Sequence, residues 1–238
     1  DIPFAEKKTS YNPKSFTGER HYLTIRYAAD YEIKSYKNLA KNVMDQHGEH
    51  GYYPHAYANV ETRGEAVFAA RNAIDGVTAN LSHGKWPYES WGINQQDDAQ
   101  MTLDFGRPVD IDKIVLYTRA DFPHDNWWES VTFTFSDGTE ETVSLEKSVE
   151  PHVIPMKRQG ITWLSFGKLI KADDPSPFPA LTQIVRGGDA DAWLTDGAVG
   201  CVRGAAASKA LTSKKTGNRC CSLRNPEGLS QLRAPWGL

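Results

Sequence analysis

Polar and apolar residues alternate along much of this chain with the two-residue period of β-strands. The alternation recurs at residues 20–27, 99–105, 131–135, 141–145 and 161–166. Residues 152–156 and 181–185 predict two more strands. In residues 109–118 (VDIDKIVLYT) the alternation changes phase near Lys113, which predicts a β-bulge. Such a series of short strands predicts an all-β fold built as a β-sandwich.

Turn signals and short helical patterns lie between these segments. Asp137-Gly138 separates two alternating runs and predicts a tight β-hairpin. Gly106-Arg107-Pro108 predicts a turn. Helical patterns are confined to the N-terminal part, with a weak one at residues 37–44 and a two-turn one at residues 65–72. Residues 51–59 (GYYPHAYAN) predict an aromatic loop.

The composition changes sharply near Gly188. Residues 189–238 hold all three cysteines, lack Ile, Phe, Tyr, Met and His, and carry seven Lys or Arg against four Asp or Glu. Such a segment buries too little apolar area to offset the entropy lost on ordering. We therefore expect three parts: an N-terminal segment (1–64) that packs on the sandwich, the sandwich itself (65–188) and a C-terminal tail of low order (189–238).

The charge and hydropathy of the chain limit its partners. The formal net charge of −3 gives no reason to expect binding to nucleic acid or to an anionic membrane. The sequence contains no run of about 18 apolar residues, so it predicts no membrane span. The sequence begins at Asp1 without Met or a charged-then-apolar leader, so we expect a fragment or a processed form. Localisation, like the oligomeric state, stays open.

The densest group of candidate functional residues follows the predicted strand 109–118. Residues 119–128 (RADFPHDNWW) place two adjacent indoles beside several hydrogen-bonding side chains. An indole face stacks on the C–H face of a sugar ring, and charged or amide groups bind its hydroxyls in pairs. We therefore predict a ligand-binding loop made by Arg119, Asp121, His124, Asp125, Asn126, Trp127 and Trp128. One of the two tryptophans is expected to be a core residue beneath the loop.

A second aromatic segment is a candidate for the same surface. Residues 85–91 (KWPYESW) contain three aromatic residues. Trp91 is the better candidate for a core position, whereas Trp86 and Tyr88, beside a proline, are candidates for exposed stacking platforms. Phe178, in a stiff acidic turn before the last predicted strand, is a further candidate for stacking.

The order of several motifs resembles the discoidin, or coagulation factor 5/8 type C, family. The motifs are Ala73-Ile74-Asp75-Gly76, a tryptophan loop, and the run AQMTLDFGRPVDIDKIVLYTR. The chain is also similar to bacterial proteins of uncharacterised function that share "SWGINQ", "ADFPHDNWW" and "ADDPSPFPALTQ". The resemblance covers about residues 65–188. It implies a jelly-roll sandwich, of the galactose-binding type, with ligand loops at one end, and a carbohydrate as the partner.

The resemblance also implies a candidate structural calcium site. Many members bind calcium through the turn that corresponds to Asp75 and an acidic residue entering the last strand, a position that is Gln183 here. A neutral amide adds no charge, and calcium affinity rises with ligand charge. We therefore expect that the protein requires no cofactor, and the sequence leaves open a structural calcium ion at Asp75 and Gln183.

Three functions remain open from the sequence. The leading one is non-catalytic carbohydrate binding. The second is a glycan-active enzyme that uses Asp121, His124 or Asp125 as acid or base, although glycosidase carboxylates commonly come from different strands. The third is a protein-interaction module with aromatic hot spots. No nucleophile elbow, phosphate loop or dinucleotide fingerprint is present.

Overall fold

The computed structural model describes residues 9–18, 20, 23–48, 51–188 and 200–204. Its strands are β1 (Leu23–Tyr27), β2 (Lys37–Asn38), β3 (His55–Ala58), β4 (Trp91–Gly92), β5 (Met101–Thr118), β6 (Trp128–Phe135), β7 (Glu140–Ser144), β8 (His152–Lys171), β9 (Ala180–Gly188) and β10 (Gly200–Gly204). Its helices are the α-helix α1 (Asp30–Lys34) and the 3-10 helices Pro13–Phe16, Thr62–Gly64, Ala66–Phe68 and Ala70–Ile74. None of these helices is long and apolar enough to cross a membrane.

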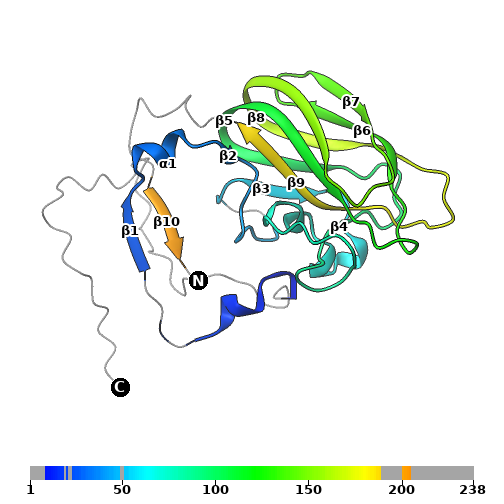
Figure 1. The fold of residues 1–238 in the computed structure, drawn as a ribbon, viewed down its shortest axis with the longest axis horizontal. Coiled ribbons are helices and arrows are strands. Elements are labelled where there is room, and N and C mark those ends of the chain that lie inside the picture. Colours follow the sequence, from blue (N-terminus) through cyan, green and yellow to red (C-terminus); the bar gives the residue numbers. More distant parts are fainter. Residues whose placement is uncertain (1–8, 19, 21–22, 49–50, 189–199, 205–238) are drawn as a thin grey trace, which may run out of the picture.

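Eight of these strands, β2 to β9, form one large antiparallel sheet that curls on itself (Figure 1). Its hydrogen-bonded order is β2-β9-β5-β8-β6-β7, while β3 pairs with β5 and β4 with β9. The long strands β5 and β8 change register between residues 104 and 113 of β5. The bulge predicted near Lys113 is confirmed there, because one of these shifts lies between Ile111 and Lys113.

A single apolar core lies inside the curled sheet. Its largest fully buried side chains include Trp91, Trp128, Phe133, Phe135 and Phe166. The two indoles meet Phe166 edge-on, with ring centroids 6.1 Å and 5.6 Å away. Aromatic edges against aromatic faces are a favourable packing arrangement. The prediction of an all-β jelly-roll sandwich with short helices in the N-terminal part is confirmed, and so is the core position of Trp91.

Several local predictions were wrong. The weak helix at residues 37–44 is absent; the segment instead forms β2 and turns, because Asn38 pairs with β9. The two-turn helix at 65–72 is two 3-10 helices, since Ala69 between them is extended. Residues 55–58 of the predicted aromatic loop pair with β5 as β3.

The predicted turn at Gly106 is part of β5. Gly106 has φ +65°, a region that a side chain disfavours, and an added Cβ would clash with the Tyr53 ring. The glycine therefore lets the strand bend and continue where a turn was expected. The Asp137-Gly138 hairpin between β6 and β7 forms as predicted, with Gly138 at φ +82°.

Residues of the N-terminal segment contact one another and the 3-10 helix Ala70–Ile74. Tyr11 is 4% exposed and its hydroxyl donates to the carbonyl of Asp45. Arg71 lies over the Tyr11 ring and donates to the carbonyl of Ser10. Residues 200–204 form β10, which pairs with β1 in a separate two-stranded sheet (Figure 1). The remainder of the predicted tail lies outside the described residues.

Candidate functional site

A buried ion pair organises the loop that joins β5 to β6. Arg119 directly follows β5, and its Nε and Nη2 donate to both oxygens of Asp125, at 2.9 Å and 2.6 Å. The carboxylate of Asp125 also accepts from the backbone N–H of Asp121 at 2.9 Å. Arg119 is 4% and Asp125 0% exposed. This bidentate ion pair holds the two ends of the loop together, because charge-assisted hydrogen bonds of this geometry fix both partners.

Asn126 ties the same loop to the segment before β9. Its side-chain NH₂ donates to the carbonyls of Ala172 and Ser176, at 3.1 Å and 2.8 Å. Its own carbonyl oxygen accepts from the Trp127 N–H at 2.6 Å. The Ser176 hydroxyl in turn donates to the carbonyl of His124. These bonds join the loop between β5 and β6 to the loop between β8 and β9. Asn126 is fully buried, so water does not compete for them.

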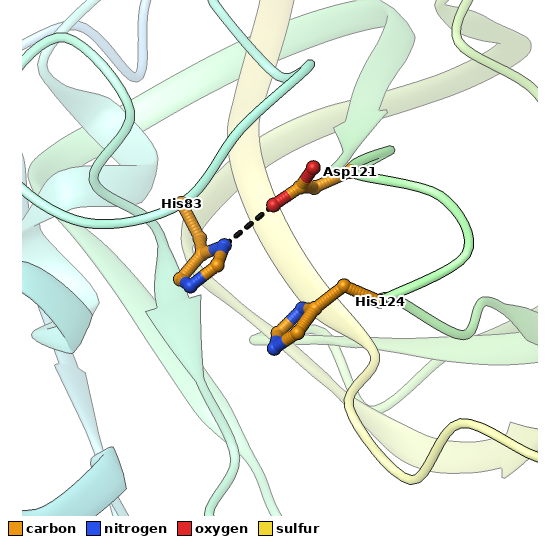
Figure 2. A group of neighbouring side chains, drawn as sticks. All are labelled: His83, Asp121 and His124. Carbon is orange, nitrogen blue, oxygen red and sulfur yellow. Dashed lines mark hydrogen bonds and ion pairs between the residues drawn. The ribbon is translucent and has the colours of Figure 1, made fainter.

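Three side chains from two loops meet above this frame (Figure 2). His83, from the loop before β4, shares a hydrogen bond of 2.5 Å between its Nδ1 and Asp121 Oδ2. His124 shares one of 2.9 Å between its Nδ1 and Asp125 Oδ1. The two imidazole rings stack with centroids 4.2 Å apart and planes 6° apart. Their side chains are 41% and 43% exposed, so the group faces solvent.

Phe178 extends this column of rings. Its ring lies 5.2 Å from that of His124, at an interplanar angle of 15°, and it is 40% exposed. The order Phe178–His124–His83 therefore places one apolar ring and two imidazoles in a single exposed stack. Asp121, with 27% of its side chain exposed, lies at the His83 end.

The aromatic residues predicted as stacking platforms have different surroundings. Trp128 is fully buried in the core. Trp127 is half-buried, and the ammonium group of Lys147 lies 5.0 Å from its ring. The same ammonium is 3.2 Å from Asp174 Oδ2. One ring of the predicted pair is therefore core, as expected for one of them, and the other is contacted by a cation of the protein itself.

The second aromatic segment is more open. Trp86 is half-buried and its backbone N–H donates to the carbonyl of Thr9. Tyr88 is 38% exposed. Both residues remain candidates for ligand contact.

Four predicted ligand contacts change role. Arg119, Asp125, Asn126 and Trp128 are buried, and the polar ones bond to one another or to the backbone. They shape the site from below and do not present groups to a ligand. Sequence reasoning missed His83, because an isolated histidine in a polar loop carries no spacing signal. Only the fold brings it to Asp121.

The carboxylates proposed for an enzyme do not form an open pair. Asp125 is fully buried, and Arg119, His124 and the Asp121 N–H occupy its oxygens. Asp121 bonds to His83. A glycosidase requires two carboxyl groups on either side of the bond it cleaves. This loop offers only Asp121 to solvent.

Gln183 occupies the centre of the candidate calcium site. Its side-chain NH₂ lies 3.0 Å from Asp75 Oδ1, and 3.1 Å and 3.2 Å from the carbonyl oxygens of Asn72 and Val77. The Gly76 N–H donates to its Oε1 at 2.9 Å, which fixes the orientation of the amide. The oxygens that would surround a cation thus accept from N–H groups. These residues do not fit calcium, since an ion needs the position that the amide nitrogen fills.

Glu89 lies behind this turn and is 2% exposed. Burial raises the pKa of its carboxyl to about 9, and the adjacent carboxyl of Asp75 adds to the increase. Removing a carboxylate from water disfavours its ionised form, and so does a like charge nearby. Burial and the nearby carboxyl of Asp75 therefore both favour the protonated, neutral form of Glu89.

One family model and several solved structures are similar to parts of this chain. A family model described as "Domain of unknown function (DUF7402)" matches residues 54–170. A comparison with curated proteins gave no match.

Similar solved structures include a mutant of chitosan-binding module 1 of a chitosanase/glucanase from Paenibacillus sp. IK-5, at 18% identity and a TM-score of 0.44, covering 65% of this chain and 100% of that one. A fucose-binding module of Streptococcus pneumoniae has 13% identity and a TM-score of 0.44, with coverages of 57% and 94%. An F5/8 type C domain from Bacteroides fragilis has 10% identity and a TM-score of 0.41, with coverages of 56% and 90%.

Proposed function

We propose that this chain is a non-catalytic carbohydrate-binding module whose ligand contacts His83, Asp121, His124 and Phe178. The observation that carries the proposal is the exposed stack Phe178–His124–His83 with a carboxylate at its end. An aromatic ring offers an apolar face for the C–H groups of a sugar. Imidazole and carboxylate groups supply donors and acceptors for its hydroxyls.

The frame beneath the stack supports recognition without large rearrangement. The Arg119–Asp125 pair and the Asn126 bonds hold the loop from within. A preformed site loses less conformational entropy when it binds. The site is shallow, with its side chains at the surface, so we expect weak binding by a single copy. The similar modules named above are described as binding chitosan and fucose, which agrees with a sugar ligand of unspecified identity.

Catalysis by Asp121, His124 or Asp125 is the less supported alternative. Asp125 is enclosed by its hydrogen bonds, so one half of the suggested acid–base pair cannot reach a substrate. A protein ligand is also less supported, because the exposed stack mixes imidazoles and a carboxylate with one apolar ring. Hot spots of protein interfaces are enriched in Trp, Tyr and Arg, residue types that this stack does not contain.

The proposal is tested by a glycan array with the full-length chain, in buffer containing a chelator, with sugar release assayed in parallel. His124→Ala and Phe178→Ala should each weaken binding about tenfold, the scale of one or two lost contacts. Tyr57→Ala is the matched control, since Tyr57 is 50% exposed on β3, which pairs with the other end of β5. Binding that is equal in all four proteins would overturn the assignment of this site. Sugar release would overturn the absence of catalysis.

A further inference from the structure

The His83, Asp121 and His124 group has a composition that a sugar site alone does not require. Each residue offers one ligand atom to a metal ion, and these atoms lie within 4.8 Å of one another (Figure 2). Two imidazoles and one carboxylate are ligands that zinc and similar divalent ions accept. The residues come from two loops that are about forty positions apart in the sequence, so their meeting results from the fold.

The surroundings of His124 resemble those of a metal-binding histidine. Its Nδ1 is hydrogen-bonded to Asp125 at 2.9 Å, and Asp125 is itself held by Arg119. A carboxylate that accepts from one ring nitrogen fixes the tautomer and directs the lone pair of the other nitrogen outward. Because Asp125 is fully buried, this support is rigid. The Nε2 of His124 is thereby left available for an ion.

The present arrangement needs small side-chain movements to bind an ion. Imidazole binds a metal in the plane of its ring, whereas the rings of His83 and His124 are stacked face to face. The 2.5 Å bond between His83 and Asp121 would open to about 3.3 Å, the ligand separation in a tetrahedral zinc site. Both histidine side chains are more than two fifths exposed, so the movement would open the ring stack toward solvent.

We propose that His83, Asp121 and His124 form a binding site for a zinc-type divalent cation. Three protein ligands leave a fourth position for water or another ligand. Hard ions such as magnesium prefer oxygen ligands and would bind more weakly than zinc. This inference goes beyond carbohydrate binding, and it is tested in the absence of sugar.

The experiment is calorimetric titration of Zn²⁺ into the full-length chain after treatment with a chelator. Cys201, Cys220 and Cys221 are first replaced by serine, because thiolates bind zinc themselves. We expect one zinc ion per chain. His83→Ala, His124→Ala and Asp121→Asn should each weaken binding at least about tenfold. Titration of Mg²⁺ should give weaker binding than zinc.

His47→Ala is the matched control, because His47 is an equally exposed histidine paired with a carboxylate, Glu61. It should leave zinc binding unchanged. The melting temperature of each variant without zinc reports folding, and His124→Gln replaces His124→Ala if the latter does not fold. Zinc binding that is absent in the parent, or that survives both His83→Ala and His124→Ala, overturns the proposal. The glycan array with chelator is independent of either result.

Discussion

Arg119 and Asp125 form a two-pronged ion pair beneath the loop that joins β5 to β6, with nitrogen–oxygen distances of 2.6 Å and 2.9 Å. Both side chains are buried, although the sequence places Arg119 at a strand end where an exposed, ligand-facing position is expected. The pair determines where His124 lies, since Asp125 also bonds to its ring. Its integrity is therefore a condition for the candidate site.

Arg119→Ala should destabilise the protein by about 3–5 kcal/mol, because it leaves Asp125 buried without a counter-ion. The free energy of unfolding is measured by urea denaturation. Arg63→Ala is the control: Arg63 pairs with Glu65 at the surface, and its loss should change the stability little. An Arg119→Ala protein as stable as the parent would show that the pair is not structural.

The two adjacent tryptophans should differ in how much they contribute to stability. Trp128→Ala removes a fully buried core ring and should cost about 3–5 kcal/mol of stability. Trp127→Ala removes a half-buried ring beside Lys147 and should cost clearly less. Urea denaturation measures both, and glycan binding is compared for the folded variants. Equal losses of stability would contradict the different burial of the two rings.

Glu89 should make the stability depend on pH. Its pKa rises from 4.5 to about 9 on folding, so the folded state holds a proton that the unfolded state releases. The stabilising contribution is complete below the unfolded pKa and is lost as the pH rises toward the folded pKa. Glu89→Gln cannot ionise, so the stability of this variant should fall less than that of the parent between about pH 5 and pH 9.

The comparison uses unfolding free energies of parent and variant across that range. Parallel pH profiles would show that Glu89 ionises equally in both states. Glu89→Gln keeps the size of the side chain, so we expect little change in packing. Any packing defect would lower the free energy of unfolding equally at every pH and would not change the shape of the profile.

Calcium should not stabilise the parent chain. The amide of Gln183 already donates to the oxygens of Asn72, Asp75 and Val77. A ligand that binds only the folded state raises the melting temperature by mass action. We therefore expect no shift with added calcium or with chelator for the parent, and a rise with calcium for Gln183→Glu, which adds a charged ligand. A calcium-dependent rise in the parent would show that the amide yields to the ion.

Much of the fold was predictable because strands and hairpins leave local signals. The alternation in β5 and the Asp137-Gly138 turn both depend on neighbouring residues. The continuation of β5 through Gly106 was not predictable, since the same residue that marks a turn also permits a bulge. The pairing of β3 with β5 joins residues more than forty positions apart, and no local pattern encodes it.

The sequence predicted where the loop of the candidate site lies, but not which way each of its side chains points. Residues 119–128 do form the loop above the frame, and Asp121 and His124 reach the surface. The polarity of Asp125 and Asn126 suggested ligand contacts, yet these groups bond inward. Composition cannot tell whether a polar group satisfies a ligand or the protein, because both uses need the same donors and acceptors.

Strands β5 and β8 pair with each other on both sides of the register shifts, at Met101–Asp104 and again at Lys113–Leu116. Two halves of the sandwich therefore share the same two strands, and neither half can separate while the other stays folded. Unfolding should be cooperative, with the amide hydrogens of β5 exchanging only through global opening. The loop that begins at Arg119 follows directly after this slowly exchanging strand. The first residue of the loop is therefore anchored by the most stable part of the fold.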